Sequence, residues 1–245
     1  MARKIGLNVL ETSRNAGSIP IVLVLGKSAS DTRCFLNILF SHRAFADSVL
    51  ICTQDKAFAS MCHPRLIALP RLDSSALESC LCCGMHGALG DALRTLFFDA
   101  LGDRTKRLDR VVIESDSIET PQLSHTLRHT PFLGQRYFHQ ITFRVVSAGQ
   151  VLEGGIESLV GLDPVNCQSK QFLIAIAPSE DGVSESHSGA FSLASFQACS
   201  AHIERKLPYQ GVFLLRESHE ADQDSQGSQV SISDAETFFK YFHLN

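Results

Sequence analysis

Residues 19–26 read Ile19-Pro20-Ile21-Val22-Leu23-Val24-Leu25-Gly26, a continuous apolar run rich in β-branched residues that ends at a glycine. A run without polar alternation is typical of a strand buried on both faces of a parallel sheet. A helix is expected to follow, because parallel strands are joined by crossover connections. Residues 32–40 have the apolar density of a buried helix, and Ser30 and Asp31 are candidate N-caps.

The same alternation of strands and helices continues along the chain. Further strands are predicted at residues 48–52, 66–69, 110–114, 141–146, 171–177 and 209–216. Helices are predicted at residues 88–101, 191–206 and 234–243, the first with Leu89, Leu93, Leu96 and Phe97 on one face. This order predicts a three-layer α/β fold, a mostly parallel sheet with helices on both faces. We expect one domain over residues 19–245, preceded at residues 1–18 by a mobile lead-in or an extra strand.

The composition excludes several classes of protein. The 245 residues are 44% hydrophobic and 20% charged, and no apolar run approaches the ~20 residues of a membrane span. A formal charge of −4 without a basic stripe argues against nucleic acid and anionic membranes as partners. The eight cysteines do not indicate a secreted disulfide framework, because the chain is long and has no apolar signal segment. We therefore expect reduced thiols and a cytoplasmic location.

The densest chemical signal is a cluster of cysteines, Cys80-Leu81-Cys82-Cys83-Gly84, with His86 close behind it. Three thiolates that converge suit a soft or borderline ion such as zinc, and an imidazole is a suitable fourth ligand. Cys80, Cys82 and Cys83 are therefore the candidate metal ligands. The alternative is that these thiols are buried packing groups, which is the reading adopted for the scattered Cys34, Cys52, Cys167 and Cys199.

Other histidines are weaker candidates for metal binding. His63 follows Cys62 directly and is either a further ligand or an ordinary loop residue. His125 and His129 are four positions apart, so they share one face of a helix. That spacing suits a metal pair, although exposed helical histidines without a metal are commoner.

Over residues 21–148 the chain resembles the CobW-like P-loop GTPases, a family linked to cobalamin synthesis and metal delivery. The motifs that carry the resemblance are Leu36-Asn37, Cys80-Leu81-Cys82-Cys83, Asp91-Ala92-Leu93-Arg94, and Val112-Ile113-Glu114-Ser115 followed by Pro121. The resemblance implies a P-loop-NTPase-like fold, GTP and Mg²⁺ as cofactors, and a metal ion as cargo. By position it makes Gly26, Thr32 and Glu114 candidate cofactor-binding residues, and Lys27, directly after Gly26, is a further candidate from a different backbone position.

The phosphate loop departs from the family pattern. Gly26 matches the first glycine of the pattern. Asp31 stands where the family has the glycine before the lysine, and Thr32 stands where it has the lysine. Arg33 stands where the family has the hydroxyl residue that binds Mg²⁺. An aspartate there opposes the phosphates, and arginine cannot ligate a cation. Lys27 is a possible substitute donor to a phosphate.

The guanine-reading and γ-phosphate elements depart as well. The strand at residues 171–177 is followed by Pro-Ser-Glu-Asp instead of the family's Asn-Lys pair, and Ser117 replaces a strand-end glycine. The sequence therefore predicts a degenerate GTP site beside a retained thiolate cluster.

The functional hypothesis is a CobW-like chaperone or delivery protein for zinc or a related metal, with a client metalloprotein as partner. The family's additional C-terminal domain is not expected. One alternative is an active NTPase with a relocated phosphate site that uses Lys27 or Glu114. The other is a non-catalytic interaction subunit with structural or redox-active cysteines.

Overall fold

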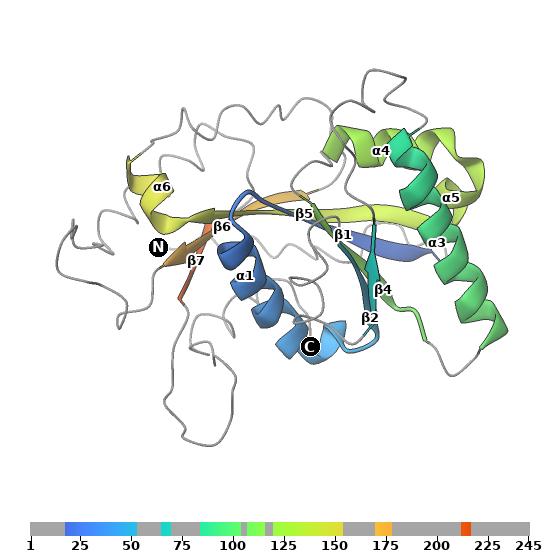
Figure 1. Cartoon of the computed structure of the whole chain (residues 1–245), viewed down its shortest axis with the longest axis horizontal. Helices are drawn as coiled ribbons and strands as arrows, with labels where there is room; N and C mark the ends of the chain where they lie inside the picture. Colours follow the sequence, from blue (N-terminus) through green and yellow to red (C-terminus); the bar gives the residue numbers. More distant parts are fainter. Residues whose placement is uncertain are drawn as a thin grey trace, which may run out of the picture.

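A computed structural model describes residues 18–52, 65–69, 84–103, 107–115, 120–153, 170–177 and 212–216 of the chain. Its strands form one seven-stranded sheet in the order β3-β2-β4-β1-β5-β6-β7, and every neighbouring pair is parallel (Figure 1). The strands are β1 (Ile19–Gly26), β2 (Ser48–Cys52), β3 (Leu66–Ala68), β4 (Arg110–Ser115), β5 (Tyr137–Ser147), β6 (Lys170–Ala177) and β7 (Val212–Arg216). The predicted α/β fold with a parallel sheet is thus confirmed.

Helices cover both faces of the sheet. They are α1 (Ala29–Ser41), the short 3₁₀ helix η1 (Arg43–Phe45), α3 (Gly84–Gly102), α4 (Thr120–His129), α5 (Pro131–Arg136) and α6 (Ala148–Glu153). The prediction of Ser30 or Asp31 as the N-cap of α1 is wrong. The cap is Ser28, whose hydroxyl accepts a hydrogen bond from the backbone N–H of Asp31 at 3.3 Å.

The two faces of the sheet carry separate hydrophobic cores, and the central strand β1 contributes side chains to both. Its side chains alternate, so Val22 and Val24 pack toward α1 while Ile21, Leu23 and Leu25 pack toward α3, α4 and α5. The α1 side is filled chiefly by aliphatic and aromatic side chains of α1, β5 and β6. A smaller third core joins α6 to β6. Because both faces are covered, the strand carries no polar residue, as its sequence indicates.

Strand β5 begins four residues before its predicted start and contains a β-bulge. The pairing with β1 shifts between Ile21, which faces His139, and Val22, which faces Ile141. The extra residue, Gln140, reverses the side-chain alternation along β5. Tyr137 therefore packs in the α3 core, whereas Ile141 packs in the α1 core. The Tyr137 hydroxyl donates to the carbonyl of Leu93 at 2.7 Å, which ties β5 to α3.

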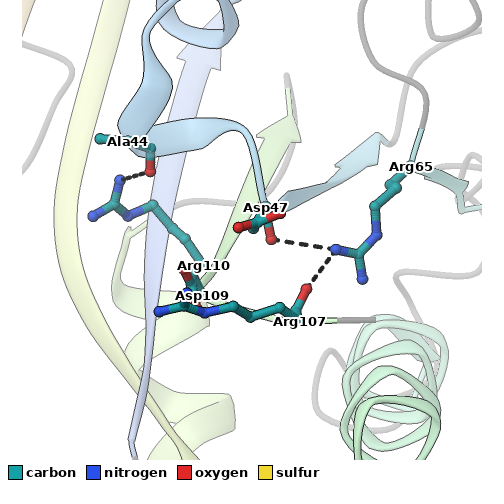
Figure 2. Close-up of polar contacts among 6 residues, drawn as sticks. All are labelled: Ala44, Asp47, Arg65, Arg107, Asp109 and Arg110. Atoms are coloured by element: carbon teal, nitrogen blue, oxygen red, sulfur yellow. Dashed lines mark hydrogen bonds and ion pairs between the residues drawn. The ribbon is translucent and has the colours of Figure 1, made fainter. Parts of the chain in front are cut away.

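An arginine joins the amino ends of β2, β3 and β4 (Figure 2). Arg65 Nη1 donates to the backbone carbonyls of Asp47 at 3.3 Å and Arg107 at 2.6 Å. The backbone N–H of Leu50 donates in turn to the carbonyl of Arg65 at 3.0 Å. We refer to these contacts as the Arg65 clamp. It holds three strand starts in register at the edge of the sheet opposite to the carboxyl ends.

Several predicted features lie outside the described residues. They are residues 1–17 of the lead-in predicted over residues 1–18, and the helices at residues 191–206 and 234–243. Within the described ranges, no helix combines the length and the apolar character that a membrane crossing requires.

Candidate functional site

The order of the strands directs attention to the carboxyl ends of β1 and β5. Strands β1 and β5 are neighbours in the sheet, but the chain continues from them in opposite directions. After β1 it goes to β2, beyond β4, and after β5 it goes to β6 on the other side. In open parallel sheets, ligands bind at such a reversal, just beyond the carboxyl ends of the strands. Gly26 ends β1 and Ser147 ends β5. Of the predicted cofactor-binding residues, Gly26, Lys27 and Glu114 lie on this edge.

The connection between β1 and α1 consists of only two residues, Lys27 and Ser28. Ser28 is the N-cap of α1. Its carbonyl accepts two hydrogen bonds from Thr32, one from the backbone N–H at 3.0 Å and one from the side-chain hydroxyl at 2.8 Å. A Walker-type loop, by contrast, is a glycine-rich segment whose several backbone N–H groups surround phosphates. This connection has no such segment, so a phosphate cradle of that kind does not fit it.

The requirement for glycine at position 26 has a packing cause. A Cβ atom on Gly26 would lie 2.0 Å from Thr32 Oγ1, closer than any real contact of a Cβ. Thr32 is itself fully buried, with its hydroxyl directed to Ser28. Thus the glycine accommodates the threonine side chain of the first turn of α1. Lys27, by contrast, is exposed at the surface.

Glu114 has a partner that the sequence reasoning missed. Its Oε2 lies 2.8 Å from Sγ of Cys52, which acts as the donor, and both residues are fully buried. Parallel pairing of β2 with β4 places the two residues side by side. A buried carboxyl group requires such a partner, because its desolvation is costly. The sequence contained a signal for this contact, because Cys52 and Glu114 are polar or polarisable residues near the ends of two apolar strands.

The Cys52–Glu114 pair faces the α1 side of the sheet. Cys52 belongs to the core that contains α1, and Glu114 has the same parity along β4 as Val112 of that core. The predicted packing role of Cys34 and Cys52 is confirmed to the extent that both side chains are buried in the core. Cys52 additionally donates a hydrogen bond to one oxygen, Oε2, of the Glu114 side chain.

The predicted metal ligands Cys80, Cys82 and Cys83 lie outside the described residues, as do Cys62, His63 and Ser117. Helix α3 begins at Gly84, directly after the cysteine motif and four residues earlier than predicted. Its buried Leu89, Leu93 and Leu96 confirm the predicted core face. Among the residues whose placement is described, no group of three His, Cys, Asp or Glu side chains is arranged to hold a metal ion. The roles proposed for the cysteines and for Gly26, Lys27, Thr32 and Glu114 therefore remain predictions.

His139 is a buried titratable group whose pKa departs strongly from its ordinary value. Its Nε2 lies 3.0 Å from the hydroxyl of Thr142, and its Nδ1 is shielded from solvent. Burial lowers the pKa of His139 to about 4, and a hydrogen bond with the backbone of Ile141 opposes that shift. The imidazole is therefore neutral near pH 7. It lies toward the amino end of β5, away from the edge where ligands are expected.

Comparison with known proteins shows structural similarity at low sequence identity. No family model and no curated protein matches the sequence. The chain is similar to the chloroplast FtsY of Physcomitrella patens, with a TM-score of 0.45 and 12% identity, covering 95% of this chain and 66% of that one. The GDP complex of the signal recognition particle receptor FtsY from Elizabethkingia anophelis gives a TM-score of 0.47 and 11% identity over the same shares of the two chains.

A third similar structure is the Zn(II)-bound GTPase YjiA from E. coli. Its TM-score is 0.40 at 15% identity, and the match covers 64% of this chain and 49% of YjiA. The chain thus spans just under two thirds of the two FtsY chains and about half of YjiA. Similarity this distant does not assign the chain to the family of any of the three.

Proposed function

We propose that this chain binds zinc or a related transition metal through Cys80, Cys82 and Cys83 and delivers it to a client metalloprotein in the cytoplasm. We propose further that its binding of GTP and Mg²⁺ is weak or absent. The observation that supports the second part most directly is the two-residue connection between β1 and α1. The first part is supported by the chemistry of the donors, because three thiolates and an imidazole form a known type of zinc site.

The position of the cysteine motif in the chain is consistent with this function. Strand β3 is followed by α3, and α3 by β4, in a parallel crossover. In such a unit the helix starts beyond the carboxyl end of the preceding strand. Because Gly84 opens α3, the motif precedes a helix that starts at the edge where α/β proteins place ligands.

Cobalt substitution tests the metal site. Co²⁺ bound by thiolates gives an intense thiolate-to-cobalt charge-transfer band, and we expect one such ion per chain. Cys80→Ser, Cys82→Ser and Cys83→Ser should each weaken the band and the binding of zinc. Cys167→Ser is the matched control and should leave both unchanged. If cobalt produces no thiolate band, or if the three variants behave as the control does, the proposal of a metal site fails.

A GTPase is the second candidate function. It is favoured by a carboxylate, Glu114, at the end of β4 beside the central strand β1. Mg²⁺-dependent GTP turnover that disappears in both Lys27→Ala and Glu114→Gln would establish it and would overturn the proposal of a lost nucleotide site. Turnover that neither substitution changes would indicate a contaminating enzyme.

A further inference from the structure

Helix α4 presents two histidines on the face that points away from the core. Leu123 and Leu127 are buried among side chains of α3 and α5. His125 and His129 are exposed, and the 3.6-residue period places them on the side of α4 opposite to these leucines. Their ring centroids are 4.0 Å apart with an angle of 34° between the ring planes. The two imidazoles thus already lie together over one turn of the helix.

We propose that His125 and His129 form a second metal site, which binds a divalent transition-metal ion such as Cu²⁺, Ni²⁺, Co²⁺ or Zn²⁺. Histidines at positions i and i+4 of a helix bind one metal ion from the same face, as they do in zinc enzymes. Metal–nitrogen distances of about 2.0–2.1 Å require the rings to splay slightly from their stacked arrangement. Exposed side chains do so by rotation about their own bonds. Water completes the coordination, because two protein ligands leave the remaining positions open.

The end of the helix favours a cation at this place. His129 is the last residue of α4, and the carbonyl groups at the C-terminal end of a helix carry partial negative charge. Arg128 is exposed beside the pair and opposes a dication through its own charge. The helix end thus favours a metal cation and the charge of Arg128 opposes it. Replacing Arg128 by a neutral residue should therefore strengthen metal binding.

This site is separate from the proposed thiolate site in its ligands and in its chemistry. Imidazole ligands suit nickel and copper as well as zinc, whereas thiolates favour softer ions. Cobalt bound by imidazole and water also lacks the charge-transfer band that thiolates produce. A failure of the histidine site and a failure of the cysteine site can thus be observed independently in one protein.

The test is a Co²⁺ and Ni²⁺ titration of the full-length, tag-free chain, with the dissociation constant measured by competition with a chelator. We expect one ion per chain that gives no thiolate band and shifts histidine proton resonances. His125→Asn and His129→Asn should each weaken this binding by roughly tenfold to a hundredfold or more. The loss of a residue that only supports a metal ligand already costs this much affinity, and each of these substitutions removes a ligand itself. Arg128→Gln should tighten it.

His42→Asn is the matched control, because asparagine can retain the N-cap that His42 provides to η1. It should leave the affinity unchanged, and circular dichroism should report the same fold for all variants. The proposal is overturned if no such ion binds, or if His125→Asn and His129→Asn bind it as tightly as His42→Asn does.

Discussion

At the scale of single residues, Gly26 provides the space that the side chain of Thr32 occupies. We predict that Gly26→Ala lowers the free energy of unfolding by about 2–3 kcal/mol, because the new methyl displaces Thr32 Oγ1 and breaks its hydrogen bond to Ser28. Urea denaturation measures the change. In a Thr32→Ala background the same substitution should cost far less, since the clashing atom is gone. Equal costs in both backgrounds would contradict this explanation.

His139 gives a prediction about pH at the same scale. Its pKa is about 4 in the folded chain and near 6.5 when unfolded. The unfolded state therefore takes up a proton first as the pH falls, and the contribution of His139 to stability is full above pH 6.5 and is lost progressively toward pH 4. The total loss is about 3 kcal/mol.

Melting temperatures of the wild type and of His139→Asn between pH 7.5 and 4.5 measure this effect. Carboxylates titrate in both proteins, so only the difference between the two curves reports on His139. We expect the wild type to lose more stability in acid than the variant does. Parallel curves would show that the imidazole is not held neutral by the fold.

At the scale of elements, the Arg65 clamp predicts a measurable contribution from an exposed side chain. Arg65→Met removes the donors to the carbonyls of Asp47 and Arg107 while it keeps an unbranched side chain. We expect a loss of about 1 kcal/mol in urea unfolding. Arg94→Met is the control, because the ion pair that Arg94 forms with Asp91 among the described residues is an exposed i,i+3 pair, worth about 0.5 kcal/mol or less. A larger effect at Arg94 than at Arg65 would contradict the role of the clamp.

The strands were predictable from sequence because both faces of the sheet are covered. The apolar runs of β1 and β2 follow from this burial on both faces. The first part of β5 was missed because His139 and Gln140 interrupt that pattern at the bulge. Helices α5 and α6 were missed because six residues are too few to show a helical period. The Thr130-Pro131 pair at the start of α5 was the available signal.

The candidate site was only partly predictable for a different reason. Motif alignment assigns a role to a position, but it does not say which atoms fill the space around it. The contact between Gly26 and Thr32, and the hydrogen bond between Cys52 and Glu114, depend on how β1, α1, β2 and β4 pack. Sequence reasoning predicted that the segment after β1 departs from the phosphate-loop pattern of the resembled family. It gave no indication that only two residues connect β1 to α1.

At the scale of the whole molecule, a ligand that binds only the folded chain raises its melting temperature. Saturation at one hundred times the dissociation constant stabilises a protein by about 2.7 kcal/mol, or roughly 5–10 °C for a chain of this size. We predict that zinc produces a shift of this order and that GTP with Mg²⁺ does not, because the β1–α1 connection lacks the backbone donors of a phosphate cradle.

Differential scanning fluorimetry measures both shifts on the same sample, and the variants separate their causes. The zinc shift should disappear in Cys80→Ser/Cys82→Ser/Cys83→Ser and survive in His125→Asn/His129→Asn, since two imidazoles hold a metal less tightly than three thiolates do. A shift with GTP and Mg²⁺ that Lys27→Ala removes would mean that the exposed lysine binds a phosphate without a glycine-rich loop, and the proposed loss of nucleotide binding would then be wrong.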